Sequence, residues 1–185
     1  MKRNSQNSSN STSTSPKRRF SDAFKKGNFL GTLERALGVW YPGPNDKPDD
    51  TNPQLQTAFR NYLIKRLEKD CVCAPREDHS LGEPDLVVLR NGDETRFDVA
   101  TCYRSQMFIG EDGEPYLPWT TQETYDKFRS YEETEGRPVY VVIGLHGYAD
   151  APRFLFCLPL EKAEIDLKKS IMSSFEIKEG ETLFK

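Results

Sequence analysis

An asparagine–glycine pair lies between two apolar-rich segments of this chain of 185 residues and predicts how the two segments pair. The pair occupies positions 91–92, and Asn-Gly in this setting is typical of a two-residue type I′ turn that joins two antiparallel strands. If the pair forms the whole turn, the residues on either side of it face each other in steps of one. That register places Asp85 directly opposite Asp98.

The predicted opposition of two carboxylates requires a compensating partner. Directly opposed residues of an antiparallel pair have Cβ atoms roughly 4.5–5.5 Å apart, and like charges at this separation destabilise a sheet. A divalent cation held between Asp85 and Asp98 would supply the compensation. A one-residue bulge or a longer loop is the alternative, and either would separate the two side chains.

The N-terminal part of the chain differs in composition from the rest. Residues 4–15 are almost wholly Ser, Asn, Thr and Gln, and such a segment has no apolar face to bury. The basic run 16–19 follows, so the remainder is more acidic than the net charge of −3 suggests. We expect a disordered basic tail over 1–27, a short helix and a linker over 28–53, and one α/β domain over 54–185. The tail either contacts a polyanion or solubilises the chain.

Several negative features indicate an intracellular, cytoplasmic protein. No apolar run approaches the roughly 20 residues that span a bilayer, and the N-terminus lacks the apolar stretch of a secretory signal. The four cysteines fall in or beside predicted strands, so we expect reduced thiols rather than a disulfide framework. The spacing of Cys71 and Cys73 matches no standard zinc motif. The run 17–19 resembles a nuclear-import patch but is too short to decide the compartment.

Two helices follow from the periodicity of apolar residues and from capping signals. Apolar side chains at helical spacing predict a helix from Pro53 to about Asp70, with Arg60 outside the apolar stripe. A second helix begins at a cap formed by Thr120 or Thr121, with Glu123 placed for a capping box, and ends at Gly136.

Strands are predicted between and after these helices. The near-continuous apolar run 138–144 is typical of a strand covered on both faces. The remaining predicted segments are a short strand over 71–74, the hairpin around 91–92, a loop over 110–118, a strand over 154–158, and a short helix with an edge strand within 161–185. The order of these elements predicts an α/β sandwich built on a mixed sheet.

This order, with acidic residues at these places, resembles the restriction-endonuclease-like PD-(D/E)XK phosphodiesterase superfamily. The resemblance covers roughly residues 55–160, and it is carried by Pro84-Asp85, by Asp98-Val99-Ala100 and by the segment 136–144. It implies an αβββαβ core with a mixed central sheet flanked by helices. It also implies metal-dependent hydrolysis of a nucleic-acid phosphodiester, by an endonuclease that acts on DNA.

The resemblance implies a ligand set for the metal. In the family, two carboxylates and one main-chain carbonyl hold magnesium, and here these would be Asp85, Asp98 and the carbonyl of Val99. Such hard oxygen ligands suit Mg²⁺, or Mn²⁺ in its place. The ion would polarise the phosphate and activate a bound water. Enzymes that cut both strands often work as symmetric pairs, so a homodimer fits this function, although the sequence carries no interface signature.

One position departs from the family pattern. The family places a lysine two residues after the second acid, where both side chains share one face of the strand, and this chain has Ala100 there. Three explanations are open. The chain is an engineered inactive variant, or the role has moved to Lys127 or Arg104, or the protein is a natural relative that binds without cutting.

The sequence therefore supports a leading hypothesis and two rivals. The leading one is a metal-dependent DNA nuclease, in an inactivated form if Ala100 replaces the lysine. The first rival is a non-catalytic module for nucleic-acid binding or protein assembly on the same scaffold. It would use the basic tail and a loop flanked by the aromatic residues Tyr103, Phe108 and Trp119. In the second rival, Asp85 and Asp98 are merely hairpin residues of an α/β protein.

Overall fold

The computed structural model describes residues 52–76, 82–92 and 95–184. In chain order the helices and strands are α2 (Pro53–Leu67), β1 (Cys71–Pro75), β2 (Leu86–Arg90), β3 (Arg96–Arg104), β4 (Phe108–Ile109), β5 (Pro115–Pro118), α3 (Gln122–Glu135), β6 (Val139–Tyr148), β7 (Ala151–Pro159), β8 (Asp166–Lys168) and α4 (Lys169–Met172). The predicted αβββαβ order is confirmed by α2, β1, β2, β3, α3 and β6. The tail predicted over 1–27 and the short helix predicted before residue 52 lie outside the described residues.

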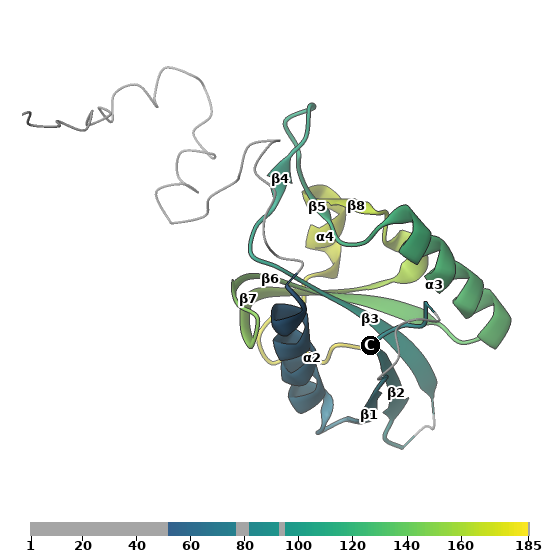
Figure 1. Cartoon of the computed structure of the whole chain (residues 1–185). Coiled ribbons are helices and arrows are strands. Elements are labelled where there is room, and N and C mark those ends of the chain that lie inside the picture. The colour runs from purple at the N-terminus through teal and green to yellow at the C-terminus, as the bar shows by residue number, and fades with distance from the viewer. Residues whose placement is uncertain (1–51, 77–81, 93–94, 185) are drawn as a thin grey trace, which may run out of the picture. The chain divides into compact units, whose positions relative to one another are not determined.

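The main sheet has five strands in the order β1-β2-β3-β6-β7 (Figure 1). Strands β1, β2 and β3 are antiparallel, β3 and β6 are parallel, and β6 and β7 are antiparallel. Parallel neighbours need a long crossover, and α3 lies within that connection. The sheet is therefore mixed, as predicted.

A second, three-stranded sheet has the order β4-β5-β8. The prediction of a loop over 110–118 is thus wrong for Pro115–Pro118, because these residues form β5 and pair with β8. The edge strand predicted in the C-terminal segment is present as β8, but it belongs to this second sheet. Leu117 of β5 and Leu167 of β8 are both fully buried, so the small sheet is anchored to the hydrophobic core.

Both main helices begin and end at residues that satisfy their terminal backbone groups. At the start of α2, the Asn52 side chain accepts a hydrogen bond from the Gln54 N–H at 2.9 Å. At the start of α3, Thr121 Oγ1 accepts from the Thr124 N–H at 3.2 Å, and Gly136 ends the helix with φ of 62°. The predicted capping box is wrong, because with Thr121 as the cap the third helical position is Thr124, not Glu123.

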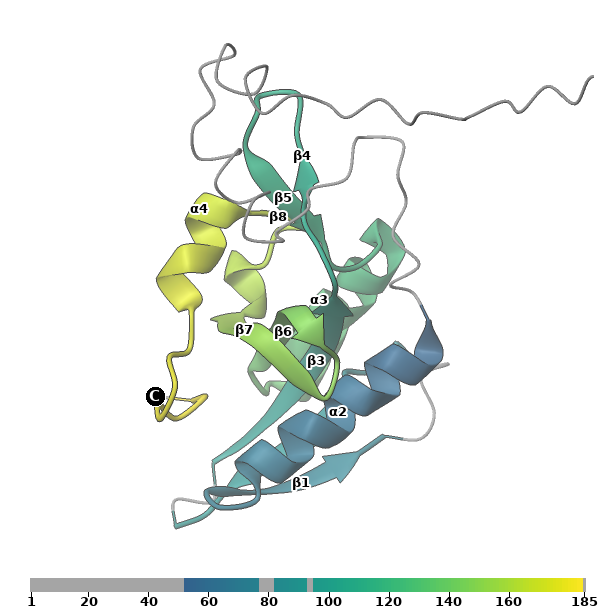
Figure 2. The ribbon, with the colours of Figure 1, turned by 90° about the vertical axis from the view of Figure 1, so that its left-hand side faces the viewer.

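Two hydrophobic clusters lie on opposite faces of the main sheet. One packs under α2 and the other under α3 (Figures 1 and 2). Successive residues of β3 alternate between them, since Val99 belongs to the α2 cluster and Ala100 to the α3 cluster. Strand β6 behaves in the same way, with Val142 under α2 and Val141 under α3. The strand predicted to be covered on both faces is confirmed.

The hairpin register differs from the prediction by two residues. Strands β2 and β3 pair Leu86 with Val99 and Val87 with Asp98, and the Arg90 N–H donates to the Thr95 carbonyl at 3.0 Å. The connection therefore spans positions 91–94 rather than the Asn-Gly pair alone, and the predicted Asp85–Asp98 pairing is wrong. A slip of two residues keeps every side chain on its face, so the alternating apolar pattern is equally satisfied by both registers.

The four cysteines all lie in strands of the main sheet, and no two of them form a disulfide. None of the helices in the described part of the chain is both long enough and apolar enough to cross a bilayer.

Candidate functional site

Asp85 lies immediately before β2, and its carboxylate points to the face covered by α2. Its Oδ2 atom accepts hydrogen bonds from the Thr101 N–H at 2.5 Å and from Thr101 Oγ1 at 2.8 Å. Its Oδ1 atom lies 3.4 Å from Nη2 of Arg60, which comes from the middle of α2. The two charged side chains are 18% and 17% exposed respectively, so this ion pair is largely shielded from water.

Arg60 supplies the positive charge beside Asp85. The residue follows the fully buried Phe59, so its side chain leaves α2 at the margin of the apolar stripe. Its Nε atom is buried and has no hydrogen-bond partner among the described residues. A guanidinium remains charged at any physiological pH. A metal ion at Asp85 would therefore have to compete with a cation that the helix already provides.

A second side chain of α2 fixes the same part of β3. Gln56 Oε1 accepts from the Tyr103 N–H at 2.9 Å, and Gln56 Nε2 donates to the Tyr103 carbonyl at 3.0 Å. Sequence reasoning missed Gln56, Arg60 and Thr101 as members of this site. The available signal was the spacing of Gln56 and Arg60, which are four residues apart and thus neighbours on one side of the helix.

Asp98 lies on the other face of the sheet, with α3. Its side chain is fully buried, and it accepts from Arg76 Nη2 at 2.8 Å on one oxygen and from Arg137 Nε at 3.0 Å on the other. Both guanidinium groups also donate to the hydroxyl of Tyr131 on α3, and Arg76 pairs with Glu83. We call these five residues the Asp98 cluster.

The charges of the Asp98 cluster reinforce one another. Burial disfavours the charged form of Arg76, but its hydrogen bond to Asp98 and the surrounding negative charge raise its pKa above the ordinary value. The pKa of Tyr131 is also raised, by burial and by the Asp98 charge, although both arginines act against this shift. The cluster at neutral pH therefore contains charged guanidinium groups around a neutral phenol.

Ala100 and Val99 are both core residues. Ala100 shares the face of Asp98, as the two-residue spacing predicts, but it is 1% exposed and packs in the cluster under α3. Val99 is fully buried under α2, and it is paired with Leu86 on one side and with Tyr140 on the other. The position expected for a catalytic lysine is thus enclosed by apolar side chains.

The two cations considered as substitutes for that lysine are engaged elsewhere. Lys127 lies on the exposed side of α3, and its Nζ atom is 2.8 Å from Glu123 Oε1. Its side chain also packs closely against Gly82, where an added Cβ would lie 2.6 Å from the Lys127 Cδ atom. Arg104 donates to three main-chain carbonyls, those of Pro118, Tyr103 and Trp119. Neither cation pairs with Asp85 or Asp98 in the described part of the chain.

The donor set does not fit the implied metal. Asp85 and Asp98 lie with different helices on opposite faces of the sheet, and each already faces at least one guanidinium group. Among residues 52–76, 82–92 and 95–184, no group of three or more His, Cys, Asp or Glu side chains is placed to hold a metal ion. Hard divalent cations need several oxygen ligands directed at one point, and the predicted set does not supply them.

The aromatic side chains predicted to flank an exposed loop are buried instead. Tyr103, Phe108 and Trp119 are 2%, 8% and 5% exposed, and the Trp119 indole N–H donates to the Glu164 carbonyl at 2.8 Å. These residues therefore pack in the core. The exposed aromatic residue in the described part of the chain is Tyr148, which is 77% exposed near the β6–β7 turn.

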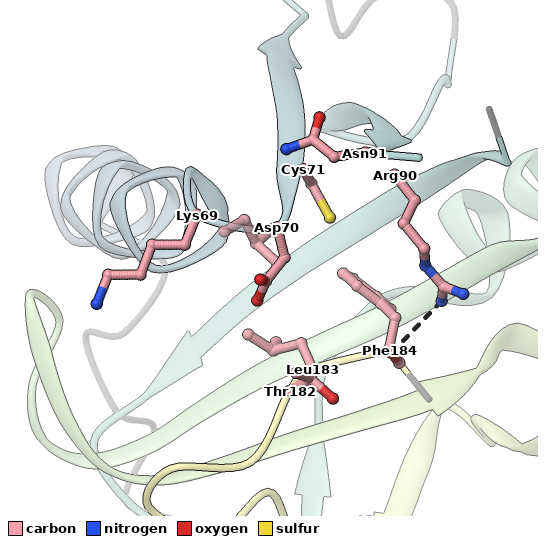
Figure 3. Close-up of a pocket in the computed structure, with 9 residues that line it drawn as sticks. Lys69, Asp70, Cys71, Arg90, Asn91, Thr182, Leu183 and Phe184 are labelled. Atoms are coloured by element: carbon pink, nitrogen blue, oxygen red, sulfur yellow. Dashed lines mark hydrogen bonds between the residues drawn. The ribbon is translucent and has the colours of Figure 1, made fainter. Parts of the chain in front are cut away.

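A cavity of about 340 Å³ lies apart from both acids, between the end of α2, the end of β2 and the C-terminal segment (Figure 3). Arg90 points towards Phe184 and donates to its carbonyl at 3.4 Å. The charged residues of the lining are Lys69, Arg90 and Asp70, two cations and one acid. None of the residues predicted to be catalytic lines it.

The second half of α2 is basic. The helix carries Arg60, Lys65 and Arg66 and contains no acidic residue between its first and last positions. Lys65 is exposed and takes part in no ion pair with a described residue. This contrasts with α3, where Lys127 and Arg129 both pair with glutamates of the same helix.

No family model and no curated protein matches the sequence. Among solved structures, the chain is similar to Hjc, a Holliday junction resolvase from the archaeal hyperthermophile Archaeoglobus fulgidus. The two share 19% sequence identity with a TM-score of 0.47, over 65% of this chain and 88% of that chain. We transfer no residue role from this similarity.

Proposed function

We propose that this chain binds nucleic acid through the α2 side of its domain and does not hydrolyse it. The observation that carries the proposal is the ion pair of Arg60 with Asp85. In the nuclease hypothesis a divalent cation would face this carboxylate. Here a fixed guanidinium faces it, and a guanidinium binds phosphate but cannot activate water as a metal ion does.

Asp98, the second predicted metal ligand, is also already occupied by guanidinium groups. Asp98 is buried with a charge-assisted hydrogen bond on each oxygen. A metal at Asp98 would have to displace a guanidinium group from this carboxylate and break a charge-assisted hydrogen bond. Hydrolysis by the predicted set would therefore require both faces of the sheet to rearrange.

The positive charge of α2 supports a nucleic-acid partner. Cations that are not balanced by neighbouring acids form the electrostatic footprint of phosphate binding. The Arg60 side chain is 17% exposed, so a phosphate oxygen reaches its guanidinium only in competition with Asp85. The basic run Lys17-Arg18-Arg19 adds further positive charge to the chain.

A metal titration separates this proposal from the nuclease alternative. That alternative is a Mg²⁺- or Mn²⁺-dependent DNA nuclease with Asp85, Asp98 and the Val99 carbonyl as ligands, and with Lys127 in place of the missing lysine at Ala100. It requires a rise in melting temperature with added metal, because an ion that binds only the folded state stabilises it. We expect no such rise and no cleavage of labelled DNA. A rise that disappears in Asp85→Asn would support the nuclease.

Two substitutions at one ion pair test the binding site directly. Arg60→Gln should weaken the binding of a fluorescein-labelled DNA, measured by fluorescence anisotropy, because a phosphate partner is lost. Asp85→Asn should strengthen it, because the carboxylate no longer competes for the guanidinium. Lys162→Gln is the matched control, since Lys162 is exposed and pairs with Glu161 outside α2. Equal weakening by both Arg60→Gln and Asp85→Asn would indicate a structural role and contradict the proposal.

A further inference from the structure

We propose that the β6–β7 hairpin presents Tyr148 as a stacking platform for an unpaired base, so that the preferred ligand is single-stranded DNA. This inference rests on the proposed function and names the ligand class for it. Tyr148 is 77% exposed, whereas every other aromatic side chain in the described part of the chain is at least partly buried. A tyrosine ring in water can stack on any base, because every base has a π-face.

The backbone that carries Tyr148 is held in an unusual conformation. His146 has φ of 58°, the only positive value at a described residue other than glycine. Gly147 has φ of 72°, and a Cβ there would lie 2.8 Å from the Ala151 carbonyl. A left-handed conformation at a residue other than glycine persists only where the surroundings impose it. The end of β6 that carries Tyr148 is therefore held in one conformation.

Specific contacts impose this conformation. The Nδ1 atom of His146 lies 2.6 Å from the Ser105 carbonyl, and its ring meets that of Phe154 edge-on at 6.0 Å. The Tyr103 hydroxyl, itself buried, donates to the Gly147 carbonyl at 2.7 Å. The end of β6 is thus tied to Tyr103 and Ser105 at the end of β3, and Tyr148 projects from a rigid support. Rigid presentation lowers the entropy lost when a ligand binds.

An unbalanced cation lies on the same hairpin. Arg153 is exposed, and its guanidinium lies over the Phe154 ring at 5.3 Å from the centroid. No acidic side chain among the described residues pairs with it. A cation and an exposed aromatic ring on one hairpin match the two parts of a nucleotide, since the cation binds phosphate and the ring stacks on the base.

The hairpin also lies beside the basic helix. The β6–β7 turn is next to α2 in both views (Figures 1 and 2). The packing is close, because a Cβ on Gly144 of β6 would lie 2.5 Å from the Phe59 ring of α2. Phosphates bound along α2 would therefore lead towards Tyr148. A single strand can turn its bases outward to reach that ring, whereas the bases of a duplex are already paired and stacked.

The test compares single-stranded and duplex DNA of equal length by fluorescence anisotropy. We expect the wild-type protein to bind the single strand more tightly. Tyr148→Ala should weaken single-strand binding roughly 5-fold to 100-fold, the range typical of one lost base–aromatic stack. Tyr148→Phe should restore it, since the ring and not the hydroxyl makes the contact. Val72→Ala is the matched control, because Val72 is 61% exposed on β1, away from the hairpin.

Salt dependence separates the two contacts. Arg153→Gln should reduce the slope of log affinity against log salt concentration by about 0.7, the contribution of one phosphate contact on a single strand. Tyr148→Ala should lower affinity without changing that slope. If Arg60→Gln weakens binding but Tyr148→Ala does not, the inference fails and the proposed function stands. If the wild-type protein binds neither DNA, the proposed function itself fails.

Discussion

At the scale of single residues, Asp85 lies immediately before β2 and Asp98 lies in β3, so both acids belong to the predicted hairpin. Their partners differ from those expected. Asp85 accepts from Thr101 and faces Arg60, and Asp98 is saturated by two arginines. The Asn-Gly signal correctly indicated a hairpin. It did not determine the register, because registers that differ by two residues bury the same side chains.

The burial of Ala100 predicts the outcome of restoring the family lysine. Ala100→Lys would place an ammonium group in the apolar cluster under α3, so we expect the free energy of unfolding to fall by several kcal/mol, as for other unpaired buried charges. We also expect no DNA cleavage. Urea denaturation measures the stability change. Ala74→Lys is the control, because Ala74 is exposed on β1, and it should change stability little. A stable and active Ala100→Lys protein would support the engineered-variant explanation.

At the scale of elements, capping residues made the helices predictable. Pro53, Thr121 and Gly136 each act at a helix end as local chemistry requires. The second sheet was not predictable in this way. Strand β5 is four residues long with proline at both ends, and β4 has two residues. Segments this short carry no alternation, so only the pairing of β4 with β5 and of β5 with β8 makes them strands.

Strand β7 contains a buried thiol that should make stability depend on alkaline pH. Burial raises the pKa of Cys157 from 9.0 to about 12. As the pH rises, the thiol therefore loses its proton in the unfolded chain before it does so in the folded one. The free energy of unfolding falls between pH 9 and pH 12 for this reason, by at most roughly 1.4 kcal/mol per pH unit. Denaturation at pH 8, 9, 10 and 11 should show a shallower decline for Cys157→Ala. Parallel pH profiles for the two proteins would contradict this.

At the scale of the whole molecule, the distribution of charge determines what the domain can bind. The chain has a net charge of −3, yet α2 is basic and the N-terminal segment carries a basic run. Affinity for nucleic acid should therefore depend on local clusters rather than on net charge. The expected homodimer and the expected intracellular location remain predictions.

Neutralising the basic run tests its share of the binding. Replacing Lys17, Arg18 and Arg19 together by glutamine should weaken DNA binding and reduce its salt slope, because phosphate contacts are lost. The melting temperature should stay unchanged, since the run lies outside the domain predicted over 54–185. Retention of full affinity at every salt concentration would assign binding to the folded domain alone. Tyr148→Ala should weaken single-strand binding by the same factor in the wild-type chain and in the chain with the triple replacement.

Local sequence patterns predict the αβββαβ order, the mixed main sheet and its two buried faces, but not the second sheet. These follow from periodicity, caps and turn residues, which act over a few positions. The meeting of charged groups depends on the packing of the helices on the sheet. Arg60 and Asp85 are brought together by the packing of α2 on the sheet, and Arg76, Arg137 and Asp98 by three segments that are distant in the chain. Ion pairs between distant segments depend on register and helix placement, which no local pattern encodes.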